Sequence, residues 1–386
     1  MHHDFAQLMQ TATRLTQEGK LTGATAAIQR ALGARQPPAE QEFEGDVIDV
    51  EARVIAVEDA VTPHAAGTDA GQPANDEAGA GTSAFPAADA EIPPVAADAE
   101  SVPRTEAFLA GRYGTGAAGR DYKLFVPPGT GSTPLPLVVM LHGCTQDPDD
   151  FAAGTAMNEA AREQGFFVLY PAQSQSANPQ RCWNWFKHSH QVRGRGEPAT
   201  LAGMTKDVMS RYAIDPSRVY VAGLSAGGAM AAILGDTYPD VFAAVGVHSG
   251  LAAGAASDLP SALGAMQGGG SAPARTSGSA SVPTIVFHGD ADRTVHPRNG
   301  EHAFAAPLGG GASATETESG SSSGGRRWTR SLQRDAGGKI VAEHWEVHGA
   351  GHAWSGGDRS GSYTDPAGPD ATAAMLAFFA LHRTQR

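Results

Sequence analysis

The chain has 386 residues, of which 41% are hydrophobic, and a formal net charge of −13. This length allows one large domain plus additional segments, with enough residues for a sizeable core. No stretch approaches 18 consecutive apolar residues, so the sequence predicts no transmembrane helix. The charge pattern contains no basic patch of the kind that binds nucleic acid.

Two short amphipathic segments lie within residues 1–35, on either side of Gly19 and Lys20, and predict a small helical hairpin. A hairpin of this size buries little apolar surface by itself. We therefore expect it to dock on the rest of the chain, to self-associate, to bind a protein or polymer-granule partner, or to be an extension without a role. The first five residues lack the basic and apolar regions of a signal peptide, which favours a cytoplasmic location.

An acidic segment follows at residues 36–103. Fifteen acidic residues and one basic residue, Arg53, lie between Glu40 and Glu100, which leaves the rest of the chain with a net charge of +1. The segment is rich in Ala, Pro, Asp and Glu and poor in aromatic residues, so it is predicted to be a disordered linker. Residues 104–386 are predicted to form a single folded domain.

Apolar runs alternate with amphipathic segments through this predicted domain. Strands are predicted at 122–126, 136–141, 166–170, 219–222, 243–247, 283–287 and 343–347, and helices at 149–162, 197–213 and within 363–382. Alternation of this kind predicts an α/β fold with a mostly parallel central sheet flanked by helices. Two Gly/Ser-rich inserts, at about 253–282 and 308–326, are predicted to be flexible loops.

The sequence Gly223-Leu224-Ser225-Ala226-Gly227 directly follows the predicted strand at 219–222. A strand that ends in G-x-S-x-G and leads into a helix of small residues has the form of the nucleophile elbow of an α/β-hydrolase. Glycine is needed on both sides of the serine because a larger side chain would collide with the neighbouring strand and helix. Ser225 is therefore the candidate nucleophile.

A serine nucleophile needs a base and an orienting carboxylate, and in this fold the acid precedes the histidine along the chain. Asp290 and Asp292 follow the strand at 283–287, and the pattern H-G-x-x-D-x-x-V favours Asp292, with Asp290 as a turn residue. His352 is the favoured base because it lies in a Gly-rich loop that can turn the ring toward the serine. The weaker candidates for the base are His296, His344 and His348.

The predicted strand at 136–141 leads into the sequence HGCTQ at 142–146. In this fold the loop after that strand donates one oxyanion-hole amide, and the residue after the nucleophile donates the other. The backbone N–H groups of Cys144 and Ala226 are therefore assigned to stabilising the tetrahedral oxyanion. The rings of His142 and His288 are expected to support their loops.

Cys144 and Cys182 are the two cysteines of the chain, and they either form a disulfide or are small buried residues. Cys182 opens a segment with Trp183 and Trp185, which predicts a buried aromatic cluster or an aromatic wall over the site. The sequence has neither H-E-x-x-H nor paired C-x-x-C, and His188 and His190 lie two apart in a predicted loop. We therefore expect no metal and no other cofactor.

Five motifs in this order resemble those of the poly(3-hydroxybutyrate) depolymerase family of esterases. They are HGCTQ at 142–146, CWNW at 182–185, GLSAGG at 223–228, HGDAD at 288–292 and GHAWSGG at 351–357. The resemblance extends over residues 105–383 and implies an α/β-hydrolase fold in which a triad of Ser225, His352 and Asp292 hydrolyses carboxylic esters through an acyl-enzyme. Trp183, Trp185 and Trp354 are then expected to contact the acyl or alcohol group of the substrate.

The resemblance implies poly- or oligo-(3-hydroxybutyrate)-type polyesters as substrates, with short-chain, feruloyl or acetylxylan esters as alternatives. Extracellular members typically carry a secretion signal and a separate polymer-binding domain, and neither is evident here, so an extracellular location is the alternative to a cytoplasmic one. The rival functions are a peptidase on the same fold and a granule-associated binding protein with an inert hydrolase fold. An intact triad argues against inertness.

Overall fold

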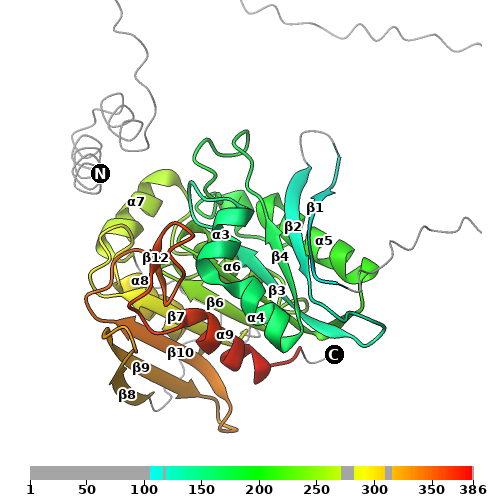
Figure 1. Ribbon diagram of the computed structural model, residues 1–386. Helices are drawn as coiled ribbons and strands as arrows, with labels where there is room; N and C mark the ends of the chain where they lie inside the picture. The colour runs from blue at the N-terminus through cyan, green and yellow to red at the C-terminus, as the bar shows by residue number, and fades with distance from the viewer. Residues whose placement is uncertain (1–104, 116–118, 271–281, 309–314, 385–386) are drawn as a thin grey trace, which may run out of the picture. The chain divides into compact units, whose positions relative to one another are not determined.

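The computed structural model of the protein describes residues 105–115, 119–270, 282–308 and 315–384 (Figure 1). The hairpin predicted at residues 1–35 and the acidic linker predicted at 36–103 lie outside the described residues. Within the described ranges, no helix combines the length and the apolar character that crossing a lipid bilayer requires.

A ten-stranded mixed sheet lies at the centre of the described structure, with the strand order β1-β2-β4-β3-β5-β6-β7-β10-β9-β8 (Figure 1). The run from β4 to β10 in this order pairs in parallel, whereas the strands outside it pair antiparallel. The strands are β1 Ala107–Tyr113, β2 Arg120–Val126, β3 Leu135–Leu141, β4 Phe167–Pro171, β5 Ile214–Leu224, β6 Ala244–His248, β7 Thr284–Gly289, β8 Thr315–Ser321, β9 Arg327–Arg334 and β10 Ile340–Val347. Two further short strands, β11 Trp354–Ser355 and β12 Thr364–Asp365, pair in parallel outside this sheet.

The central strands are buried on both faces because their sequences are nearly continuous apolar runs. In β3, Val139 and Leu141 belong to one apolar cluster, and Val138 and Met140 belong to another. Since successive side chains of a strand point to opposite faces of the sheet, these two clusters are the cores on its two sides. The predicted α/β fold with a mostly parallel sheet is confirmed.

Two groups of helices cover the two faces of the sheet (Figure 1). The helices are α3 Pro148–Thr155, α4 Met157–Gln164, α5 Gly196–Arg211, α6 Ala226–Thr237, α7 Leu259–Gly268, α8 Arg298–Ala305 and α9 Ala371–Ala380, with 3-10 turns η2 His188–His190 and η3 Ala306–Leu308. Helices α5, α6 and α8 supply one apolar cluster, and α3, α4 and α9 supply the other. Because β3, β5, β6, β7 and β10 run parallel to one another, the loops that follow them gather at one edge of the sheet.

Three sequence-based expectations about these elements are wrong in detail. The helix predicted at 149–162 is two helices, because Ala156 adopts a left-handed φ of 51° between α3 and α4. The insert at 253–282 contains α7, whose first turn is closed by a capping box between Asp258 and Ser261. The insert at 308–326 contains β8, an exposed edge strand that pairs with β9. Hydrophobic periodicity does not reveal elements made of such small and polar residues.

Among the described residues, burial lowers the pKa of four histidines by a large amount. The pKa falls to about 4 in His142, well below its usual value in His248, to about 3 in His344 and to about 4 in His382. The folded protein keeps these rings neutral, whereas the unfolded chain takes up protons below about pH 6.5, so their stabilisation is present above that pH and is lost as the pH falls. We expect the free energy of unfolding, measured by urea denaturation, to drop by about 2 kcal/mol for each of His142, His344 and His382 between pH 7 and pH 5, and His248 to add to the drop in the same direction.

His382 provides a control for this acid sensitivity. Its ring packs on Phe378 with the ring centroids 4.6 Å apart, and within the described residues neither ring nitrogen has a hydrogen-bond partner. The variant His382→Phe removes one titrating group without breaking a side-chain hydrogen bond, so its stability should fall less steeply with acid than that of the wild type. Equal stabilities at pH 7 and pH 5 in the wild type would contradict the prediction.

Candidate active site

Ser225 lies in a strained turn between β5 and α6. Its φ of 58° and ψ of −119° fall in a region that residues other than glycine rarely adopt. A Cβ atom at Gly223 would lie 2.4 Å from the carbonyl carbon of Gly227, and one at Gly227 would lie 2.0 Å from the carbonyl oxygen of Leu141. The two glycines therefore allow β3, β5 and α6 to approach closely enough for the turn to form, as expected for a nucleophile elbow.

Asp292 and His352 form a hydrogen-bonded pair after β7 and β10. His352 Nδ1 donates to Asp292 Oδ2 at 2.7 Å, with the carboxylate side chain fully buried and the imidazole side chain 12% exposed. The other carboxylate oxygen accepts from the N–H groups of Thr294 and Val295 at 2.8 and 3.0 Å. This pairing leaves the lone pair of His352 on Nε2, for which the described residues provide no hydrogen-bond partner.

The carboxylate of Asp292 is held in its ionised form. Burial acts to raise the pKa of this group, but the nearby ring of His288 and the hydrogen bond from His352 outweigh burial and hold the pKa well below its usual value. His288 Nε2 lies 2.9 Å from the carbonyl oxygen of Val295 and 3.4 Å from Asp292 Oδ2, so its ring supports the loop that carries the acid. A permanently ionised Asp292 can both orient His352 and stabilise its imidazolium form.

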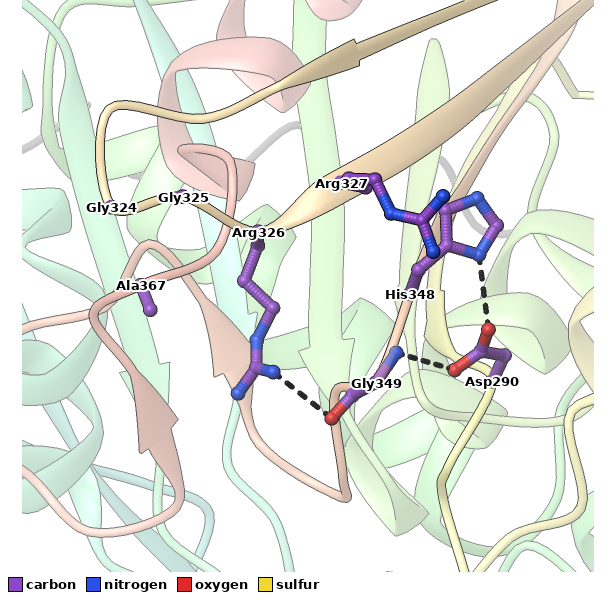
Figure 2. A pocket seen from close by; sticks show the side chains of 8 residues that line it. All are labelled: Asp290, Gly324, Gly325, Arg326, Arg327, His348, Gly349 and Ala367. Atoms are coloured by element: carbon purple, nitrogen blue, oxygen red, sulfur yellow. Dashed lines mark hydrogen bonds and ion pairs between the residues drawn. The ribbon is translucent and has the colours of Figure 1, made fainter.

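The two weaker candidates, Asp290 and His348, form a second Asp–His pair (Figure 2). Asp290 Oδ2 accepts from His348 Nδ1 at 3.0 Å, and its other oxygen accepts from the N–H of Gly349 at 2.6 Å. This pair is more exposed than the first, with side chains 36% and 28% exposed. His348 Nε2 also bonds the Thr329 hydroxyl at 2.8 Å. Because both nitrogens of His348 are engaged, this pair is less suited than Asp292 and His352 to serve a serine.

A pocket of about 420 Å³ adjoins the second pair (Figure 2). Arg326 crosses it, donating from Nη1 to the carbonyl oxygen of Gly349 at 3.0 Å and from Nε to Asp365 at 2.7 Å. Asp290, Glu346 and His348 offer potential metal-ligand atoms within 4.8 Å of one another. A metal would have to displace a hydrogen bond of His348, so the arrangement serves to hold the backbone before His352 and is not a preformed metal site.

The candidate oxyanion loop, residues 142–146, is braced by a disulfide and by hydrogen bonds. The sulfurs of Cys144 and Cys182 lie 2.09 Å apart, so the structure forms the disulfide that the sequence left as one of two alternatives. The Gly143 N–H donates to Gln146 Oε1 at 2.9 Å, and the Thr145 N–H donates to the carbonyl oxygen of Gln180 at 2.7 Å. Among the described residues, neither the Cys144 N–H nor the Ala226 N–H has an acceptor, so both can donate to an oxyanion.

A buried polar network lies under this loop. His142 Nδ1 donates to the carbonyl oxygen of Gly143 at 2.8 Å, and its Nε2 accepts from the N–H of Gln173 at 3.1 Å. The Gln173 amide donates to Glu197, which also accepts from the N–H and the amide of Asn184. Burial acts to raise the pKa of Glu197, but the contact with His190 Nδ1, 3.5 Å away, and the hydrogen bonds from Gln173 and Asn184 outweigh it and lower the pKa. The sequence contained no motif that marks Glu197, because its partners come from separate segments.

The three tryptophans predicted to contact substrate are buried. Trp183, Trp185 and Trp354 are 1%, 5% and 1% exposed. Trp183 donates from Nε1 to the carbonyl oxygen of His142 at 3.1 Å, and Trp354 donates to the Thr372 hydroxyl at 3.1 Å. Of the two alternatives for the segment after Cys182, this arrangement matches the buried aromatic cluster. Substrate contact by these rings stays a prediction.

His248, at the end of β6, links the segments that carry the three candidate catalytic residues. Its carbonyl oxygen accepts from the Ser225 N–H at 2.8 Å, and its Nε2 accepts from the Ser355 N–H at 2.9 Å. Its ring stacks on Phe287 and Trp354, with centroids 5.7 and 4.9 Å away. Sequence reasoning missed this residue, although its place at the end of a buried strand beside the elbow strand was a usable signal.

The remaining histidine candidates take no part in the Asp292–His352 pair. The buried ring of His344 packs on Phe304 of α8, with ring centroids 5.7 Å apart. His296 accepts at Nδ1 from the N–H of Arg298 at 3.2 Å, at the start of α8. Neither has a hydrogen bond to Ser225 or Asp292 among the described residues.

Comparisons with known proteins relate part of this chain to a family of esterases. Residues 120–308 match the family described as "Esterase PHB depolymerase". Poly(3-hydroxyalkanoate) depolymerase C of Paucimonas lemoignei is 35% identical over 198 residues, which cover 48% of this chain and 47% of that protein. Acetylxylan esterase A of Talaromyces purpureogenus is 31% identical over 204 residues, which cover 48% of this chain and 52% of that protein. The chain thus spans about half the length of these curated relatives.

A solved structure extends the likeness beyond the family match. The acetyl xylan esterase from Aspergillus awamori aligns with a TM-score of 0.57 and 22% identity, covering 71% of this chain and 99% of that one. At this identity the likeness establishes the fold alone. The family match includes Ser225 and Asp292 and ends before His352. The described residues thus have the fold of an α/β-hydrolase, and residues 120–308 form a domain that matches the PHB depolymerase family of esterases.

Proposed function

We propose that the protein is a serine esterase that hydrolyses carboxylic esters through Ser225, His352 and Asp292. The observation that carries the proposal is the buried hydrogen bond of 2.7 Å between His352 and Asp292, at the sheet edge where β5 ends in the strained Ser225 turn. The family match and the esterases among the relatives support the same reaction class.

The geometry supports a two-step mechanism. The Ser225 hydroxyl oxygen attacks the ester carbonyl carbon while His352 Nε2 takes its proton, and the negative oxygen of the tetrahedral intermediate accepts hydrogen bonds from Cys144 and Ala226. The intermediate collapses with cleavage of the ester bond, and His352 gives the proton to the departing alkoxide. Water then attacks the acyl-enzyme by the same route, releasing the acid and restoring Ser225.

We further propose poly- or oligo-(3-hydroxybutyrate)-type polyesters as the preferred substrates. A relative named as a poly(3-hydroxyalkanoate) depolymerase supports this class, and relatives named as acetylxylan esterases support acetylated xylan as the second candidate. Both are carboxylic esters, so one catalytic arrangement serves either. The surface that receives the group beside the ester decides between them.

Substrate profiling and active-site labelling of the full chain test the proposal. We expect hydrolysis of solubilised 3-hydroxybutyrate oligomers to have a higher kcat/KM than that of acetylated xylo-oligosaccharides, methyl ferulate or a p-nitrophenyl acyl series. A serine-directed fluorophosphonate should inactivate the enzyme at one equivalent and modify the peptide that contains Ser225.

The outcomes separate the alternatives. Highest activity on acetylated sugars would replace the polyester assignment with that of an acetylxylan esterase, and activity confined to short acyl chains would indicate a general esterase. Absence of both hydrolysis and labelling would overturn the enzyme assignment and favour the granule-binding function.

A further inference from the structure

Tyr363 combines an exposed aromatic side chain with an unusual backbone conformation. It lies directly before β12, its φ is 53°, and 40% of the residue is exposed. The other large apolar residues that are exposed in the described part of the chain are aliphatic. Backbone strain of this kind persists only when surrounding contacts enforce it, and it concentrates at functional sites.

Contacts from two sides enforce the conformation of this segment. On one side, the Ser362 N–H donates to Asp150 Oδ1 at 2.8 Å, and the Gln146 amide donates to the Ser362 carbonyl oxygen at 3.2 Å. On the other side, the Trp354 N–H donates to the Tyr363 carbonyl oxygen at 2.6 Å. Gln146 belongs to the oxyanion loop and Trp354 follows His352 by two residues. Tyr363 is therefore fixed between the two loops that the proposed mechanism uses.

The phenol group of Tyr363 lies over the oxyanion loop. Its hydroxyl oxygen is 3.3 Å from the Thr145 hydroxyl oxygen, and Thr145 is itself exposed and follows Cys144. The Thr145 hydroxyl donates its proton to the carbonyl oxygen of Cys144. Tyr363 must then donate to Thr145, which leaves the lone pairs of the phenol oxygen available to accept a hydrogen bond from a ligand.

We propose that Tyr363 and Thr145 form a substrate subsite at the oxyanion loop for an aliphatic unit that carries a hydroxyl group. This inference rests on the proposed esterase function. It specifies which chemical group of the substrate, next to the ester, the site recognises. The ring face packs on the C–H surface of that unit, and the phenol oxygen accepts a hydrogen bond from its hydroxyl. A 3-hydroxyacyl unit of an oligoester and a sugar of acetylated xylan both have this chemistry.

Kinetics of Tyr363→Phe and Tyr363→Ala test the subsite. Tyr363→Phe keeps the ring and removes the acceptor, so the ratio of KM for a 3-hydroxybutyrate trimer to KM for p-nitrophenyl acetate should rise about threefold to tenfold, the equivalent of one hydrogen bond. Capping the free hydroxyl of the trimer by acetylation should abolish that rise. Tyr363→Ala should raise the ratio further, because it also removes the ring. The same rise with an acetylated xylo-oligosaccharide in place of the trimer would identify a sugar as the occupant.

Leu381→Ala is the matched control, since Leu381 is also apolar and is 55% exposed. Leu381 follows α9 and directly precedes His382. The carbonyl oxygen of His382 accepts a hydrogen bond from the hydroxyl of Tyr220, which lies in β5 before the elbow at Ser225. An unchanged KM ratio in both Tyr363 variants would overturn the subsite. An equal loss of activity on every substrate would overturn it too, because the ring would then serve to hold the site together.

Binding measurements keep this test separate from the esterase assignment. Calorimetric titration of the trimer into Ser225→Ala and into Ser225→Ala/Tyr363→Phe should give a Kd about threefold to tenfold higher for the double variant. This result is expected even if the wild type hydrolyses no ester, a finding that would count against the proposed function alone. Equal Kd values would overturn the subsite whatever the catalytic result.

Discussion

Replacing Ser225 by alanine is expected to lower kcat for ester hydrolysis by about 10⁴- to 10⁶-fold, the scale of loss when a triad nucleophile is removed. The acyl-enzyme cannot form without the hydroxyl, whereas the oxyanion amides and the Asp292–His352 hydrogen bond persist. KM should change little, because the change removes one oxygen atom. The measurement is steady-state hydrolysis of p-nitrophenyl acetate, with thermal denaturation to verify the fold.

Ser249 provides the matched control for this substitution. It follows β6, the neighbour of β5, is fully buried, and has a positive φ of 47°. Its hydroxyl is 3.2 Å from His248 Nδ1. Ser249→Ala thus removes a hydroxyl at the end of the neighbouring strand, at a residue whose φ is also positive, and we expect a loss of about tenfold at most, the equivalent of one hydrogen bond. Equal losses in the two variants would mean that Ser225 is not the nucleophile.

Replacing Asp292 by asparagine is expected to lower kcat by about 10⁴-fold, the loss seen when a triad carboxylate becomes an amide. The carboxylate accepts a hydrogen bond from the Nδ1–H group of His352 and so keeps Nε2 unprotonated. An asparagine can donate to Nδ1 instead, which moves the imidazole proton to Nε2 and prevents that nitrogen from acting as the base. The loss should appear in kcat at pH 7 and 8, since the pKa of Asp292 is held well below that range.

Asp290→Asn is the control that decides between the two Asp–His pairs. Asp290 bonds His348 as Asp292 bonds His352, so the same chemical change is made at a position two residues away. We expect kcat to fall less than tenfold, because Asp290 acts only through the backbone before His352. A greater loss in Asp290→Asn than in Asp292→Asn would transfer the base to His348.

Some features of the candidate site could be predicted from the sequence, whereas others required the structure. Gly223 and Gly227 could be interpreted correctly because a close approach of strand and helix requires glycine at those positions. The choice of Asp292 over Asp290 rested on a motif, and the structure adds that His348 has no free nitrogen. The disulfide was one of two alternatives, because the distance between Cys144 and Cys182 depends on how two loops fold.

His248 and Tyr363 were beyond sequence reasoning because their environments are assembled from distant segments. His248 accepts from Ser355, which is 107 residues away along the chain, and Tyr363 contacts Thr145, which is 218 residues away. Neither lies in a motif that names its partner. The buried tryptophans illustrate the converse case, since aromatic residues near a site motif predict a substrate wall as readily as a core, and only packing shows which rings are covered.

The sequence by itself determined the alternation of strands and helices, the strained serine turn and the order of the candidate triad. These features depend on local rules, namely the periodicity of apolar residues, the steric requirement for glycine and the place of a residue at the end of a strand. Only the tertiary structure decided which acid bonds which histidine, which aromatic rings are exposed and what holds each loop. Those outcomes depend on distances between segments far apart in the chain, and local propensity does not specify such distances.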